Sequence, residues 1–225
     1  MNGQNDTEPA PTVFVVDDDP AARRAIAWML ESVGRRVETF DCGEAFLQTH
    51  RPDRSGCLIL DLRMPGMSGL TMLEELTRRG IGLPVIILTG YGEVAVAVEA
   101  LQRGAVDFIE KPVDDARLQQ CIDTAFALDA ERRRRECLRH ARILRIGRLT
   151  PREREVMSMV VAGKANKVVA YELGISEKTV ESHRARMMSK LEVESLPDLV
   201  RLEWLAIHGD PPRGLSSGQS LRPGP

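Results

Sequence analysis

The sequence lacks the features of a membrane, exported or zinc-binding protein. None of its apolar runs approaches the roughly 20 residues that span a bilayer, and the polar residues 1–10 contain no signal-peptide core. Its four cysteines are scattered, without the close pair that holds zinc: Cys42, Cys57, Cys121 and Cys137. We therefore expect a cytoplasmic protein with no membrane partner, whose cysteines are reduced and carry no chemistry.

Net charge is also small, at −2 for 225 residues, but it is unevenly distributed. Residues 1–128 carry 12 Lys and Arg against 20 Asp and Glu, whereas residues 129–147 carry 7 against 3. An acidic first half is compatible with a cation site, and a more basic remainder with a polyanionic partner. The 43% hydrophobic and 28% charged content favours two folded domains.

In the first half, short apolar runs alternate with amphipathic segments. We predict strands at 12–16, 36–40, 57–61, 84–88 and 105–109, and helices at 21–33, 44–49, 70–79, 94–103 and 116–128. Five strands alternating with five helices are typical of an α/β doubly wound parallel sheet. Ligands of such sheets bind at the carboxyl ends of the strands, so the residues after each strand are the first candidates for chemistry.

Charged and polar residues follow four of the predicted strands. They are Asp17, Asp18 and Asp19 after the first strand, Asp61 at the third, Thr89 at the fourth and Lys111 after the fifth. Right-handed crossovers can bring these strand ends to one edge. Close carboxylates repel each other unless a cation lies among them, and their oxygen atoms suit Mg²⁺. Taken alone, Asp17–Asp19 predicts no more than a turn with a helix N-cap before Pro20.

Together these motifs resemble the receiver domain of two-component response regulators. The matching stretches are Val-Val-Asp-Asp-Asp (15–19), Leu-Asp-Leu-Arg-Met-Pro-Gly-Met-Ser-Gly (60–69), Leu-Thr-Gly (88–90) and Asp-Phe-Ile-Glu-Lys-Pro (107–112). The resemblance implies that Asp61 is the phosphoacceptor and that Thr89 and Lys111 bind the phosphoryl oxygens. It also implies a Mg²⁺ site formed by Asp17, Asp18, Asp61 and the backbone carbonyl of Arg63.

The same resemblance implies a switch formed by Thr89 and Phe108, in which Thr89 moves toward the phosphate and Phe108 turns inward. Phe108 has an equally good interpretation as a core aromatic residue, and Tyr91 is a competing aromatic nearby. The Lys111-Pro112 bond resembles a cis junction of the family, although sequence alone leaves its isomer open. Small apolar residues at 94–100 suggest that the surface they form dimerises.

The second half has the pattern of a helix-turn-helix. Thr150 is a predicted cap for a helix starting at Pro151, a short helix at 166–173 ends at Gly174, and Ser176 caps a longer helix at 177–191. Residues 149–207 resemble the LuxR-type four-helix DNA-binding domain at the stretches 149–156, 163–167, 173–184 and 190–191. A receiver joined to this domain resembles the NarL/FixJ group, with the FixJ branch nearest.

By that resemblance, residues 177–191 lie in the major groove. Base edges would be contacted by Glu181, Ser182 and Ala185, and phosphates by Lys178, Thr179, Arg186, Lys190, Asn166 and Lys167. His183 is left between a phosphate contact and a structural hydrogen bond. Without the family context, these polar residues would be interpreted as a solvated helix face. Val168-Val169 departs from the family, which often has an acidic residue followed by Ile.

The expected domains are a receiver at 10–128, a helical linker at 129–147, an all-α four-helix DNA-binding domain at 148–208 and a disordered tail at 209–225. In the linker, Arg132–Arg135 form either a solvated helix face or contacts to DNA or to a second chain. The expected function is a transcription factor that a cognate sensor histidine kinase phosphorylates on Asp61. Phosphorylation promotes homodimerisation, binding to promoter DNA and, through RNA polymerase, activation of transcription.

We expect no enzymatic activity beyond phosphoryl transfer to and from Asp61. A phosphatase of the haloacid dehalogenase type would need a second acid two residues after Asp61, where this chain has Arg63. Another alternative is a phosphorylation-independent regulator whose receiver serves only as a protein-interaction module. Such a module would have no need for the whole set Asp17, Asp18, Asp61, Thr89 and Lys111.

Overall fold

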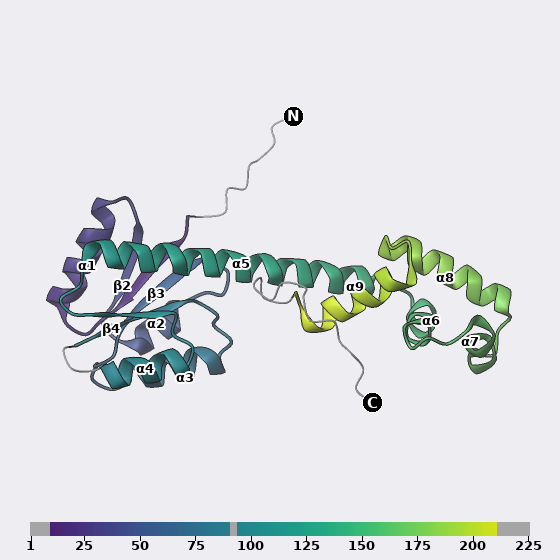
Figure 1. Ribbon diagram of the computed structural model, residues 1–225, viewed down its shortest axis with the longest axis horizontal. Helices are drawn as coiled ribbons and strands as arrows, with labels where there is room; N and C mark the ends of the chain where they lie inside the picture. The colour runs from purple at the N-terminus through teal and green to yellow at the C-terminus, as the bar shows by residue number, and fades with distance from the viewer. Residues whose placement is uncertain (1–9, 91–93, 211–225) are drawn as a thin grey trace, which may run out of the picture. The chain divides into compact units, whose positions relative to one another are not determined.

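The computed structural model describes residues 10–90 and 94–210 (Figure 1). The chain divides into two compact units, Met1–Arg132 and Arg133–Pro225. Of the tail that the sequence predicts at 209–225, residues 211–225 lie outside the described part, as does Tyr91. No helix among the described residues is long and apolar enough to cross a membrane.

The first unit contains a parallel five-stranded sheet with the order β2-β1-β3-β4-β5. Its strands are β1 Thr12–Val16, β2 Arg36–Phe40, β3 Gly56–Asp61, β4 Val85–Thr89 and β5 Asp107–Glu110. Its helices are α1 Pro20–Ser32, α2 Gly43–Thr49, α3 Gly69–Arg78, α4 Val94–Gln102 and α5 Asp115–Gly147. The predicted doubly wound sheet is confirmed, and the largest shift is at β5, which begins two residues later than predicted.

Alternate residues of the buried strands face two separate cores, as the two-residue period of a strand requires. Phe14, Leu58 and Ile87 pack with α2, α3 and α4, whereas Val13 and Ile59 face α1 and α5. Figure 1 shows the same arrangement, with α1 and α5 on one side of the sheet and α3 and α4 on the other. Helices therefore cover both faces, which leaves the strand ends as the accessible part of the sheet.

The strand order determines where a ligand can bind at the edge of the sheet. The chain leaves β1 toward β2 on one side and returns to β3 on the other, so the ends of β1 and β3 lie next to each other. Their register pairs Val16 with Leu60, one residue before Asp17 and Asp61 respectively. This is the topological switch point at which doubly wound sheets bind ligands.

At the amino ends of the strands, the backbone of Gly56 lies very close to that of Thr12. Its φ is +150°, and a Cβ atom there would lie 1.8 Å from the carbonyl oxygen of Thr12. The Gly56 amide donates a 3.0 Å hydrogen bond to the carboxylate of Asp129, which is 2% exposed. Only glycine fits this position. The hydrogen bond to Asp129 connects α5 to the start of β3.

The second unit is all helical. It contains α6 Pro151–Val161, α7 Asn166–Leu173, α8 Glu177–Leu191 and α9 Leu196–His208, together with the last turns of α5. Val156, Val169, Val180, Leu191 and Leu199 are buried in one core. Thr150 and Glu153 form a capping box at the start of α6, and Gly174 in the left-handed region ends α7 before Ser176 caps α8. The predicted helix-turn-helix is confirmed.

Candidate functional sites

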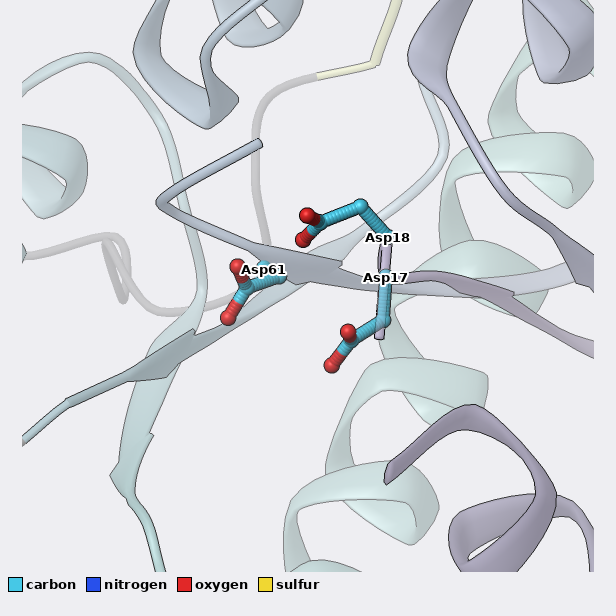
Figure 2. Close-up of side chains that lie close together, drawn as sticks. All are labelled: Asp17, Asp18 and Asp61. Carbon is cyan, nitrogen blue, oxygen red and sulfur yellow. The ribbon is translucent and has the colours of Figure 1, made fainter. Parts of the chain in front are cut away.

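Three carboxylates meet at the carboxyl edge of the sheet (Figure 2). Asp17 and Asp18 follow β1 and Asp61 ends β3, and one oxygen of each lies within 4.8 Å of the others. Asp17 and Asp61 are buried, whereas Asp18 is exposed. The neighbouring Asp19 has another role, because its side chain accepts the Ala21 amide and caps α1. The triplet thus contains both the predicted N-cap and two members of the predicted cation site.

An ammonium group bridges the two buried carboxylates. Lys111 Nζ donates to Asp61 Oδ1 at 2.6 Å and to Asp17 Oδ2 at 2.8 Å. The other oxygen of Asp61 accepts the backbone amide of Arg63 at 3.1 Å, and Asp17 Oδ1 accepts that of Asp19 at 2.9 Å. Each of the two buried carboxylates is therefore held in one orientation by one charged and one backbone donor.

Burial and charge act in opposite directions on these groups. Burial raises the pKa of Asp61, and this outweighs the opposing effect of the hydrogen bond from Lys111. For Lys111, burial alone lowers the pKa, but the hydrogen bonds to Asp17 and Asp61 more than offset it, so the pKa is raised. Lys111 remains a cation, and Asp61 is held in an environment that disfavours its negative charge.

The other predicted receiver residues are also placed at this edge. Thr89 ends β4, is 1% exposed, and its backbone carbonyl accepts the Lys111 amide at 2.8 Å. The Lys111-Pro112 bond is cis. Phe108 is partly buried and packs against the core that α2, α3 and α4 cover, a position compatible with both roles considered from sequence.

The acidic cluster fits a divalent cation. Its carboxylate oxygens are the hard ligands that Mg²⁺ prefers, and exposed Asp18 leaves room for the waters that this ion retains. Lys111 binds one oxygen of each buried carboxylate, and the other oxygen, which accepts a backbone amide, keeps a second lone pair that could bind a cation. A cation held by these carboxylates would, together with the Lys111 ammonium, attract an anionic group to Asp61.

A second candidate site is the outer face of α8. Lys178, Glu181, Ser182, Ala185 and Arg186 are all exposed, whereas Val180 is fully buried as predicted. Thr179 is different, because its amide and hydroxyl both bond to the side chain of Ser176 in the helix cap. The exposed set runs along one side of the helix at three- and four-residue spacing, as a groove-binding helix requires.

Two basic side chains of α8 bind other residues of the second unit, which the sequence did not predict. Lys190 Nζ donates to Glu153 Oε2 at 2.7 Å, and Glu153 is buried. Arg184 donates to the side chain of Asn166 at 2.6 Å, which ties α8 to the first residue of α7. Sequence reasoning missed both pairs; the capping-box glutamate was the available signal for the first, because a buried carboxylate needs a cationic partner.

Comparison with protein families matches both units. The family model of the response regulator receiver domain matches residues 13–123, and that of bacterial regulatory proteins of the luxR family matches residues 147–203. The two models follow each other in the order that the motifs predict. Neither match identifies individual site residues.

Individual relatives have both parts. The transcriptional regulatory protein FixJ of Azorhizobium caulinodans is 46% identical over 194 residues, which cover 86% of this chain and 92% of the relative. FixJ of Rhizobium meliloti is 44% identical, covering 85% and 94%. Among solved structures, the response regulator StyR is 42% identical with a TM-score of 0.74, covering 87% and 98%. Full-length FixJ from B. japonicum is 39% identical with a TM-score of 0.53, covering 87% and 97%.

Proposed function

This chain belongs to the two-component response regulators that join a receiver domain to a luxR-type DNA-binding domain, and we propose that Asp61 is the phosphoacceptor of its switch. As a family member it is a transcriptional regulator and not a classical enzyme. The observation that carries the proposal is the position of Asp61 at the end of β3, within hydrogen-bond distance of the Lys111 ammonium and beside the carboxylates of Asp17 and Asp18.

The phosphoryl group comes from a phosphohistidine of a cognate sensor kinase. A carboxylate oxygen of Asp61 attacks phosphorus, the new O–P bond replaces the N–P bond, and the electron pair of that bond stays with the histidine. Lys111 and the Thr89 hydroxyl bind the phosphoryl oxygens. Asp17, Asp18, Asp61 and the backbone carbonyl of Arg63 would hold Mg²⁺, which supplies positive charge to those oxygens when bound.

The output is DNA binding through α8. We assign base-edge contacts to Glu181, Ser182 and Ala185, and phosphate contacts to Lys178, Thr179, Arg186, Asn166 and Lys167. Exposure of the first three and of Lys178 and Arg186 supports this assignment. Lys190 leaves the predicted set, because its ammonium is held by buried Glu153.

Phosphorylation promotes homodimerisation in the cytoplasm, and the dimer recruits RNA polymerase at a promoter. Exposed apolar residues of α4 support a dimer surface on the receiver, since Val98 and Leu101, three residues apart on one side of the helix, are 45% and 36% exposed. Phe108 and Thr89 link that surface to Asp61. Two copies on two half-sites would gain the affinity that a single helix-turn-helix lacks.

The test is DNA binding by the wild type and Asp61→Asn, each with Mg²⁺ and with or without a small phosphodonor, at fixed salt. The probe is a duplex enriched from a random-sequence pool by the phosphodonor-treated wild type. We expect the phosphodonor to tighten binding and to produce a dimer by gel filtration for the wild type only. Equal binding by both proteins under all conditions would replace the proposal with the phosphorylation-independent alternative.

A further inference from the structure

The last turns of α5 carry three arginines whose guanidinium groups are all engaged within the second unit. Arg139 donates from Nε to the carbonyl of Ala206 at 3.2 Å and from Nη2 to that of Ile207 at 3.3 Å. Arg142 forms a bidentate pair with Asp210, at 2.7 and 3.1 Å. Arg145 donates from Nη2 to the carbonyl of Leu191. These side chains bind the protein itself.

Two of these three contacts are made at the carboxyl ends of helices. Ala206 and Ile207 lie in the last turn of α9, and Leu191 is the last residue of α8. The final four carbonyls of a helix have no partner inside it, and they carry the negative end of its dipole. A cationic donor at that position stabilises the helix end and fixes its direction.

Glu192, the residue that follows α8, also interacts with Arg145. Glu192 has a φ of +51°, the only positive φ of a non-glycine residue in the described ranges 10–90 and 94–210. This left-handed conformation is unfavourable for a residue with a Cβ atom. Nη2 of Arg145 also lies 3.4 Å from the Glu192 carboxylate, so one guanidinium group binds both the last carbonyl of α8 and the side chain of its strained cap.

Arg145 is also more enclosed than a solvent-facing arginine. Its side chain is 28% exposed, and its Nε is buried without a hydrogen-bond partner in the described structure. The adjoining Ile146 packs against the core that contains Leu191 and Val180. Burial of the unpaired Nε is unfavourable. The contacts of Nη2 and the packing of Ile146 must offset this cost for the Arg145 side chain to stay where it is.

We propose that Arg145 is a positioning residue for DNA binding, which fixes the carboxyl end of α8 and makes the last turns of α5 a structural part of the DNA-binding domain. The inference rests on the proposed role of α8 as the helix that reads DNA. When the guanidinium group is lost, the last turn of α8 is held only by buried Leu191 and by the pair of Lys190 with Glu153, so it moves more than the preceding turns of the helix. Base contacts depend on the angle of the helix in the groove, whereas contacts to phosphate tolerate a shift.

The experiment uses three full-length variants: Arg145→Met, Arg145→Lys and the control Arg148→Met. Arg148 lies three residues further along and is exposed, so its substitution removes the same charge without removing a helix cap. Each protein is titrated with the duplex enriched by the wild type and with an unrelated duplex of equal length, across a series of salt concentrations. Amide hydrogen exchange in the last turn of α8 is measured on the same samples without DNA.

We expect Arg145→Met to weaken binding to the enriched duplex about tenfold, the effect of one charge-assisted hydrogen bond. Binding to the unrelated duplex and its salt dependence stay unchanged, exchange in the last turn of α8 is faster, and Arg145→Lys is intermediate. Arg148→Met matches the wild type in both the base-specific preference and the exchange. If Arg145→Met does not fold, Arg145→Lys takes its place with the same criteria.

Two results would overturn the proposal. Equal weakening on both duplexes, with the salt slope reduced by about one, would make Arg145 a phosphate contact. Unchanged exchange in the last turn of α8 would show that Arg145 does not hold that turn. If the wild type enriches no duplex from the pool, the proposed DNA-binding role of α8 fails, while the exchange measurement still decides whether Arg145 positions the helix.

Discussion

Replacing Lys190 with Met should destabilise the second unit by about 2 kcal/mol. The variant removes the ammonium from a pair in which the Glu153 side chain is 4% exposed and the Lys190 side chain 39%. Leaving one partner of a fully buried pair uncompensated costs about 3–5 kcal/mol, and an exposed pair contributes about 0–1 kcal/mol. This pair is buried on one side only, and Glu153 keeps the Thr150 amide at 2.9 Å, so an intermediate value applies.

The assay is differential scanning calorimetry of the full chain as a function of pH. A loss of this size lowers the Tm of a unit this small by on the order of 10 °C. The hydrogen bond from Lys190, followed by that from the Thr150 amide, lowers the pKa of Glu153 from 4.5 to about 2. A lowered pKa stabilises the folded state above the ordinary value, and that stability is lost as the pH falls toward 2. The difference between wild type and variant should be full at pH 6 and should shrink below pH 4.5.

Lys178→Met is the matched control, because it removes the same charge from the exposed face of α8. We expect it to leave the Tm unchanged and to reduce the salt slope of DNA binding by about one. The opposite pattern would refute the reasoning: Lys190→Met would leave the Tm unchanged and reduce the salt slope, as the sequence alone predicted for a phosphate contact.

Three further predictions concern the first unit. Gly56→Ala should lower its stability by more than about 3 kcal/mol in calorimetry, since the added Cβ would lie 1.8 Å from the Thr12 carbonyl oxygen; a smaller loss would show that the backbone relaxes there. Asp61→Asn should raise the Tm at neutral pH, because burial raises the pKa of Asp61 and so disfavours its negative charge in the folded state. The gain in Tm should disappear as the pH falls below 3.8, where the carboxyl group is neutral in both states; a gain independent of pH would show that the charge is not its cause. Asp18→Asn should weaken Mg²⁺ binding at least about tenfold in a calorimetric titration, with no change of Tm in the absence of metal; unchanged binding would remove Asp18 from the site.

Much of the first unit could be predicted from sequence because its signals are local. Strands β1 and β2 match their predicted ranges, and α7 and α8 of the second unit do as well. Apolar runs, capping residues and glycines at helix ends specify such segments without tertiary information. The predicted start of β5 is two residues too early, because Gly104, with a φ of +102°, lets the chain turn through Ala105 and Val106 before the strand begins.

The contacts that sequence could not predict join residues far apart in the chain. Lys190 reaches Glu153 across 37 positions, and Arg145 reaches Leu191 across 46. Both cations belong to helices whose composition favours a solvated basic face, and only the packing of α5, α6 and α8 brings them within reach of these partners. The acidic site was easier, because parallel strands bring their carboxyl ends to one edge whatever the details of the helices.

The bridge from Lys111 to Asp17 and Asp61 also bears on the life of the protein before any signal arrives. Two buried negative charges at one edge would otherwise make the newly synthesised receiver depend on the supply of a metal ion in order to fold. Because Lys111 Nζ lies 2.6 and 2.8 Å from the two carboxylates, we expect the receiver to fold without a bound metal ion. Folding of the receiver would then not depend on the metal ion that the proposed phosphoryl transfer to Asp61 uses.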